Sequence, residues 1–273
     1  MTRQTATSQT FLLSKPGRKH RVRGFAPLQP EHISSRQRVH EVVAQANSHS
    51  LWISDDKPLT DTLLNALASR TGSLGAMVLL YQPTLASIPV LLRYFYRVVF
   101  GGEKDLLPPE ELAEVLAAPN KADLFIGGIV DDDSKTLTLW RGDLTTLTVP
   151  FTAFPTSGDG ITPDFAAFAV IDYGHTVRLG AYEAATEALL YEYDPLYRRR
   201  IARERRKEDR SFGAALRRLR KQRGVKRADF APLAAKTIAR LEQGKVDPDH
   251  LRPSTLSIIA KRLAVEPSDI KTY

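Results

Sequence analysis

The residues best able to perform chemistry are scattered along this chain. It contains no cysteine, and its histidines show neither H-x-x-x-H spacing nor neighbours that would complete a zinc site. The acidic run "DDDSK" at 131–135 could hold a hard cation, but it lies between two strand-like runs, where a tight acidic turn is the commoner outcome. We therefore expect no bound metal and no cofactor. The six histidines are His20, His32, His40, His49, His175 and His250.

No set of residues forms a recognisable catalytic arrangement. Asp172, Tyr173 and His175 make the best polar cluster, yet a solvated strand end explains it equally well. The glycine pairs in "GGE", "FIGG" and "SGDG" lack the strand and helix context of a phosphate loop. Trp140 with Arg141 is typical of a packed aromatic ring covered by an arginine. The sequence predicts a protein that is not an enzyme, and no residue supports an enzyme tethered to DNA.

The charge of the chain is divided sharply along its length. The formal net charge is +8, but residues 1–24 contribute +6, residues 25–197 contribute −11 and residues 198–245 contribute +13. The last segment, residues 246–273, is neutral. A basic block beside an acidic middle indicates that one module binds a polyanion while the remainder does something else.

The basic block contains two amphipathic segments with helix signals. In "SFGAALRRLRKQRG", Ser211 can cap a helix that ends at Gly224, and the apolar residues of the segment form one stripe. In "AAKTIARLEQG", Ile238 and Leu241 are spaced to face a core. Helical periodicity then leaves five residues outside, and they include groups that can bond base edges or phosphates. These five are Ala235, Lys236, Thr237, Arg240 and Gln243.

From residue 212 the chain resembles the Cro/repressor-type (Xre-like) helix-turn-helix family. The resemblance covers about 60 residues, and it implies that 235–243 form a recognition helix and that the protein binds palindromic DNA as a dimer, with half-sites about 34 Å apart. It also implies that Glu242 is a structural partner for Arg217 or Arg220. The matching positions are Leu216, Leu219, Arg220, Gly224, Val225, Phe230, Ala231, Ile238, Leu241, Glu242, Gly244, Leu256, Ile259, Ala260, Leu263, Val265 and Ile270.

One departure from the family pattern concerns the second helix. Only "PLAAKT" separates Ala231 from Ile238, roughly three residues fewer than usual, and Pro232 falls where the helix would continue. We expect a second helix of a single turn. The full set of candidate DNA-binding residues is Ala235, Lys236, Thr237, Arg240, Gln243, Lys226, Arg227, Arg217, Lys221 and Lys245. Taken alone, the charged face of 217–223 is more typical of an ordinary solvated helix.

The rest of the chain is interpreted from its periodicity. The segments "TDTLLNALASRTG", "TLASIPVLLRYFYRVVFGG" and "PPEELAEVLAAPN" predict helices, the first capped by Thr60 or Asp61. Alternating runs from 123 onward predict an antiparallel meander of about four strands, with "AYEAATEALLYEYDP" as a covering helix. This part is similar to a small domain of unknown function that sometimes precedes a Cro-like domain.

The expected fold class is α+β, with a helical N-terminal region, a small meander-plus-helix domain and an all-α C-terminal domain. Residues 196–210 are either an extended spacer or the start of the next helix, and their contact with DNA stays open. Residues 1–38 are expected to be a disordered basic arm, with an organelle transit peptide as the alternative. The expected segments are 1–38 (arm), 39–104 (mainly helical), 105–195 (meander), 196–210 (basic linker) and 211–273 (helix-turn-helix).

These patterns predict a DNA-binding transcriptional regulator of bacterial type. Its expected partners are double-stranded DNA, a second copy of itself, and a partner protein or small effector at the middle domain. An antitoxin that neutralises a partner protein and autoregulates through the same DNA-binding domain is the alternative. We expect a cytoplasmic protein without membrane contact, because charged residues and prolines interrupt the most apolar region, 75–100.

Overall fold

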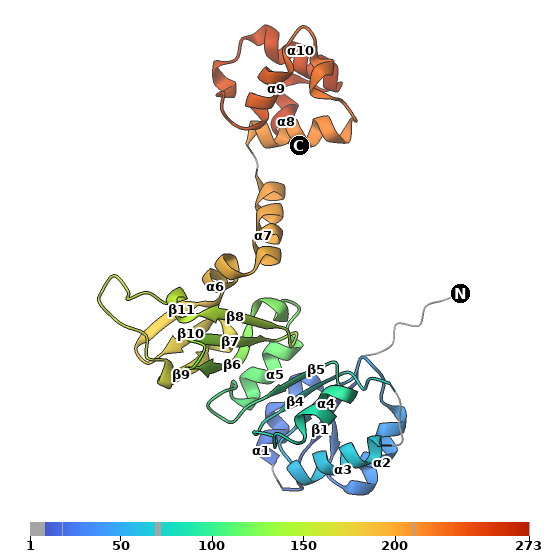
Figure 1. The fold of residues 1–273 in the computed structure, drawn as a ribbon. Coiled ribbons are helices and arrows are strands. Elements are labelled where there is room, and N and C mark those ends of the chain that lie inside the picture. Colours follow the sequence, from blue (N-terminus) through green and yellow to red (C-terminus); the bar gives the residue numbers. More distant parts are fainter. Residues whose placement is uncertain (1–8, 18, 69–71, 210, 273) are drawn as a thin grey trace. The chain divides into compact units, whose positions relative to one another are not determined.

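The fold is known from a computed structural model that describes residues 9–17, 19–68, 72–209 and 211–272 (Figure 1). The chain divides into two compact units, Met1–Pro195 and Leu196–Tyr273. The first unit contains a parallel sheet followed by two small antiparallel sheets, and the second contains the basic C-terminal helices.

The predicted fold class is wrong. The sequence predicts an α+β chain with a helical N-terminal region and an all-α C-terminal domain, whereas the structure is mixed α/β with a five-stranded parallel sheet and two three-stranded antiparallel sheets. The parallel sheet has the strand order β2-β1-β3-β4-β5. Its elements are β1 (Thr10–Leu13), α1 (Lys19–Gly24), β2 (Glu31–Ile33), α2 (Arg36–Gln45), β3 (Leu51–Ser54), α3 (Lys57–Leu67), β4 (Ala76–Leu79), α4 (Ile88–Tyr94) and β5 (Arg97–Phe100).

The central parallel strands β1, β3 and β4 escape prediction because both of their faces are buried. Such strands are short continuous apolar runs without the alternation that marks a half-exposed strand. In "TLASIPVLLRYFYRVVFGG", a single predicted helix is in fact α4 followed by β5. The predicted arm, 1–38, is likewise wrong for its described part, because β1 pairs with both β2 and β3 inside the sheet.

Helices cover both faces of the parallel sheet. Phe11, Leu13 and Trp52 point to one face and form a buried cluster with apolar residues of α2, α3 and α4. The alternate residues Leu12 and Ile53 are also buried and point to the opposite face. The predicted helix at 60–72 exists as α3, but its cap is Asp56, whose Oδ1 accepts the Leu59 N–H at 2.8 Å.

The second half of the first unit carries the predicted meander, divided between two antiparallel sheets. One sheet has the order β6-β7-β8 and the other β11-β10-β9. The predicted covering helix begins later than expected, because its first residues form a strand that pairs with β10. The elements are α5 (Pro109–Ala117), β6 (Phe125–Asp131), β7 (Thr136–Arg141), β8 (Thr146–Pro150), β9 (Phe168–Ile171), β10 (Thr176–Leu179), β11 (Tyr182–Ala185) and α6 (Thr186–Tyr193).

The second unit packs its helices around one apolar cluster. Phe212, Leu216, Leu219, Phe230, Ile238 and Leu241 meet Ile259, Leu263 and Ile270 in its centre. Residues 195–208, for which the sequence allows either a spacer or a helix, form a helix of their own. The elements are α7 (Pro195–Glu208), α8 (Phe212–Gln222), the 3-10 turn η6 (Arg227–Phe230), α9 (Ala235–Glu242), the turn η7 (Pro248–His250), α10 (Pro253–Leu263) and the turn η8 (Pro267–Thr272).

Candidate nucleic-acid interface

The candidate interface is built on α8, η6 and α9. Ser211 caps α8, since its Oγ accepts the Ala214 N–H at 3.3 Å, and Gly224 follows the helix with φ +66°, as the sequence predicts. The expected shortening of the second helix is confirmed, because η6 is a single turn of four residues. Asp229 in that turn accepts the N–H of Lys226 at 2.8 Å and so closes its start.

A glycine lets α8 and α9 approach each other closely. A methyl group at Gly213 would lie 2.3 Å from the carbonyl oxygen of Leu241, which is closer than any side chain tolerates. Gly213 is thus part of the contact that fixes the position of α9, and any larger residue would push the two helices apart.

A buried carboxylate joins the same helices. The side chain of Glu242 is 1% exposed, and it accepts hydrogen bonds from Arg220 of α8 and from Arg227 of η6, the latter at 2.9 and 2.6 Å from Nε and Nη2. Arg220 also donates from Nη1 to the carbonyl oxygen of Val225 at 2.9 Å. The predicted pairing of Glu242 with Arg220 is confirmed, while the alternative partner, Arg217, does not contact it by a hydrogen bond.

The electrostatics of Glu242 follow from this geometry. Burial alone raises the pKa of the carboxyl, but the hydrogen bonds and charges of Arg220 and Arg227 outweigh it, so the pKa is lowered from its ordinary 4.5. The carboxylate therefore stays ionised at neutral pH and holds α8, η6 and α9 in one arrangement. Its role is structural, as the resemblance implies.

The outward face of α9 carries a row of polar side chains. Ile238 and Leu241 are 0% and 1% exposed, which confirms the predicted phase of this helix. On the other side, Lys236, Arg240 and Gln243 are exposed and follow one another at i, i+4 and i+7. We call these three residues the α9 row. Of the neighbouring candidates, Ala235 is exposed and Thr237 is half-buried.

The remaining predicted contacts lie around the α9 row or away from it. Lys226 is exposed at the start of η6, and Lys245 is exposed just after the end of α9. Arg227 donates from Nε and Nη2 to Glu242, so it helps to hold the frame of the interface, and its contact with DNA stays a prediction. Nothing in the sequence distinguishes it from Lys226 beyond the fork-shaped guanidinium that suits a shared carboxylate.

Arg217 and Lys221 are brought together on α8. Both are exposed on α8 and line a cavity of about 330 Å³, to which no described residue of the α9 row contributes. Arg203 of α7 and Arg218 of α8 line the same cavity. Asp209 and Glu242 also line the cavity, so the four basic residues leave this second surface with a net positive charge, suited to phosphate contacts.

The polar clusters of the first unit have structural explanations. Asp172 and Tyr173 form a tight turn in which the Tyr173 N–H donates to Glu111 at 3.1 Å. Asp131 closes the turn at "DDDSK" by accepting the N–H groups of Asp133 and Ser134. Within the described ranges, no three His, Asp or Glu side chains converge in a way that could hold a metal ion. Of the described helices, none has both the length and the apolar composition that a membrane crossing requires.

No protein-family model, no curated protein and no solved structure matches this chain. The assignment of a function therefore depends on the geometry of the interface itself.

Proposed function

We propose that this protein is a transcriptional regulator that binds double-stranded DNA selectively through α9. The observation that carries the proposal is the α9 row, because it exposes three hydrogen-bonding side chains on one side of a helix whose other side is buried. An ordinary solvated helix would show the same exposure. An ordinary solvated helix has no requirement for a fixed angle, whereas the buried Glu242 and the close contact at Gly213 together fix the angle of α9 against α8.

The dimensions and chemistry of the α9 row suit the major groove. A helix of eight residues is about 12 Å long, comparable with the width of that groove. Arg240 can bind guanine through O6 and N7, Gln243 can bind adenine through N6 and N7, and Lys236 can bind guanine or a phosphate. Ala235 at the start of the helix leaves room for the DNA backbone to approach.

The surrounding charges are suited to holding the phosphates. Lys226 and Lys245 flank the α9 row in the sequence, and Arg217 and Lys221 supply the second positive surface. Proteins that use such helices commonly bind two half-sites about 34 Å apart as dimers. We therefore propose that a second copy of the chain completes the DNA-binding form. We also propose that the protein acts in the cytoplasm.

Selection of random duplexes by the intact protein, followed by fluorescence anisotropy on the enriched sequence and on a scrambled one, tests the proposal. Lys236→Ala/Arg240→Ala removes two positive charges from the α9 row, and Lys261→Ala/Arg262→Ala removes two exposed charges from the end of α10 as a matched control. We expect the first variant to lose about 2–6 kcal/mol on the enriched site, since each good base contact contributes about 1–3 kcal/mol.

The comparison of the two variants separates base recognition from charge. Both should weaken scrambled-duplex binding by similar, smaller amounts, because that binding depends on phosphate contacts alone. An equal loss on enriched and scrambled duplexes in the α9 variant would contradict the assignment. Failure to enrich any sequence would show that the basic unit binds backbone only.

A further inference from the structure

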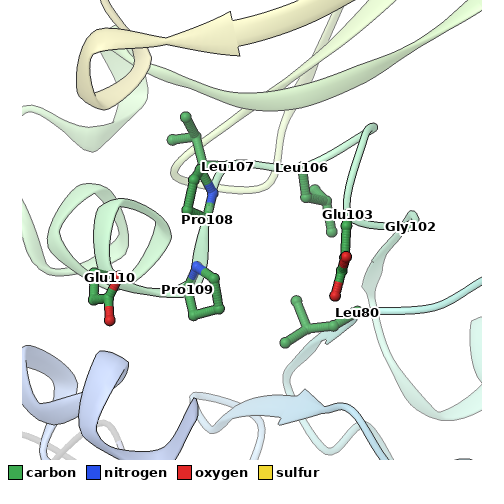
Figure 2. Close-up of a pocket in the computed structure, with 8 residues that line it drawn as sticks. All are labelled: Leu80, Gly102, Glu103, Leu106, Leu107, Pro108, Pro109 and Glu110. Carbon is green, nitrogen blue, oxygen red and sulfur yellow. The ribbon is translucent and has the colours of Figure 1, made fainter. Parts of the chain in front are cut away.

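Two apolar surfaces of the first unit are open to solvent, and one of them is a cavity. It has a volume of about 400 Å³, and Figure 2 shows the residues that line it. Its margins take part in packing within the unit, because the Asp105 carboxylate accepts the Gly102 N–H at 2.8 Å and the Gln82 side-chain amide at 3.2 Å. A methyl group at Gly24 of α1 would lie 3.1 Å from the Pro109 Cβ. The cavity therefore belongs to the junction between the parallel sheet, α1 and α5.

The other apolar surface is formed by α4 and the residues that flank it. Eight large apolar side chains are exposed in the described part of the chain, and four of them lie within residues 85–96. They are Leu85, Val90, Leu92 and Tyr96, whose exposed fractions are 86%, 40%, 57% and 59%. We call these four residues the α4 patch.

The α4 patch lies on the side of the helix that faces away from the core. Leu91 and Tyr94 are 1% and 5% exposed, and they belong to the buried cluster beside the parallel sheet. Leu92 is exposed and follows the exposed Pro89 by three residues, which places the two on the same side of the helix. The patch residues Leu85 and Tyr96 come just before and just after α4, so they extend this surface at its two ends.

The chemistry of the α4 patch suits another apolar surface. Residues 81–98 contain no acid, and the exposed charge among them is Arg93, whose guanidinium lies 5.5 Å from the ring centroid of Tyr94. Four exposed apolar side chains beside one arginine give little attraction for a polyanion such as DNA. A partner that covers the patch must itself be apolar at the point of contact.

The area of the α4 patch is comparable with the apolar part of a dimer interface. With about 150 Å² for each fully exposed large side chain, the exposed fractions of the four residues correspond to roughly 360 Å². A standard interface buries about 800 Å² on each partner, and a little over half of that area is apolar. The patch therefore supplies most of the apolar area that a standard interface requires.

The second unit has no comparable surface of its own. Among its described residues, Leu196 at the boundary is the large apolar side chain that is exposed, and residues 197–272 add no other. A two-fold symmetric DNA site needs two recognition helices held at a fixed spacing. The contact that joins two copies is therefore expected in the first unit.

We propose that two copies of the chain associate through the α4 patch, with the patch of one copy on the same patch of its partner. A two-fold axis allows one self-complementary surface to serve both copies, so that the association closes at a dimer. The choice of a second copy as the partner rests on the proposed function. The association itself is measured without DNA.

Sedimentation velocity of the intact protein tests the proposal. Leu85→Glu/Leu92→Glu brings four carboxylates into one desolvated interface, and Ile129→Glu/Tyr173→Glu changes two exposed apolar residues elsewhere in the first unit as a matched control. We expect the wild type and the control to be dimers at micromolar concentrations and the dissociation constant of the α4 variant to be at least about 100-fold higher. Tryptophan fluorescence during urea unfolding shows that each variant is folded.

Cross-linking provides a second measurement that leaves the interface intact. The chain contains no cysteine, so Leu92→Cys introduces a single thiol at the centre of the α4 patch. A short bismaleimide should join two copies of this variant in high yield. The same reagent should join few copies of Ile129→Cys, whose thiol lies outside the patch.

DNA binding separates failure of this proposal from failure of the proposed function. The α4 variant should bind the enriched two-fold duplex roughly 100-fold or more weakly than the wild type and bind a single half-site equally well. A monomeric wild type, an undiminished dimer in the α4 variant, or equal cross-linking at both positions would overturn association through the patch. A dimer that depends on the patch but enriches no DNA sequence would overturn the proposed function alone. A monomer whose binding to phosphatidylglycerol vesicles is lost in the α4 variant would assign the patch to a membrane surface instead.

Discussion

Removal of the Glu242 carboxylate should loosen the second unit and leave the first intact. Glu242→Ala takes the shared acceptor away from Arg220, whose side chain is 12% exposed, and from Arg227, which is 40% exposed. Breaking a buried ion pair by removing one partner typically costs about 3–5 kcal/mol, because a buried charge is left without compensation. Arg227 can turn to water, so we expect a loss near the low end, about 3 kcal/mol.

Hydrogen exchange followed by mass spectrometry measures this loss where it occurs. A loss of about 3 kcal/mol corresponds to roughly 100-fold faster exchange in peptides from α8 and α9. The two tryptophans, Trp52 and Trp140, both lie in the first unit. Their fluorescence during urea unfolding therefore provides an internal control, and its midpoint should not change.

A second variant decides whether the cost comes from the uncompensated charge. Arg220→Met/Glu242→Leu removes the most buried pair together and replaces it with apolar groups of similar size, which is commonly neutral or stabilising. We expect exchange in α8 to return close to the wild-type rate. If the double variant is as unstable as Glu242→Ala, or if Glu242→Ala changes exchange less than about fivefold, the reasoning from burial and charge is refuted.

Three further predictions follow from single contacts. The folded pKa of Glu242 lies below its ordinary 4.5, so the stability that its carboxylate contributes is complete above pH 4.5. This contribution should be lost as the pH falls below 4.5 through the folded pKa, and hydrogen exchange of α8 and α9 should become faster. Glu242→Gln should remove this pH dependence of the exchange. Gly213→Ala should destabilise the second unit by about 1–3 kcal/mol, measured by the same exchange, because its methyl group would meet the Leu241 carbonyl oxygen at 2.3 Å; unchanged exchange would disprove the close contact. Burial raises the pKa of Tyr81 above its ordinary 10.0, so the folded state holds that proton more tightly. Its contribution to stability should be lost as the pH rises above 10 through the raised folded pKa, and ultraviolet titration should show a late-titrating tyrosine that is missing in Tyr81→Phe.

The elements that the sequence predicts correctly are those determined by near neighbours along the chain. The cap at Ser211, the helix ending at Gly224, and the buried phase of Ile238 and Leu241 each depend on residues within one or two helical turns. The single turn of η6 follows from Pro232 in the same way. Local signals of this kind need no knowledge of which distant segments pair.

The parallel sheet cannot be predicted by the same means. Strand β1 pairs with β3, about forty residues away, across two α-helices and another strand. Its residues "TFLL" are too few and too uniformly apolar to show a period of two. The predicted cap of α3 is also misplaced: Thr60 is buried against Ser54, at 2.8 Å between their hydroxyl oxygens, and Pro58 is the available sign of an earlier start.

The α9 row and the loop after β5 differ in how they are encoded. The α9 row lies on one helix, so the amphipathic period of that segment is enough to identify Lys236, Arg240 and Gln243. The loop after β5 begins with "GGE" at 101–103, and the sequence of this segment does not indicate the contacts that the loop makes. Gly101 is needed there because a methyl group on it would lie 2.7 Å from the Asp105 Cβ, whereas a methyl group at Gly102 would meet Asp105 only at 3.6 Å, an ordinary contact. Gly101 and Asp105 are only four residues apart, but the sequence does not show that the Asp105 carboxylate also accepts the side-chain amide of Gln82 from the loop after β4, at 3.2 Å.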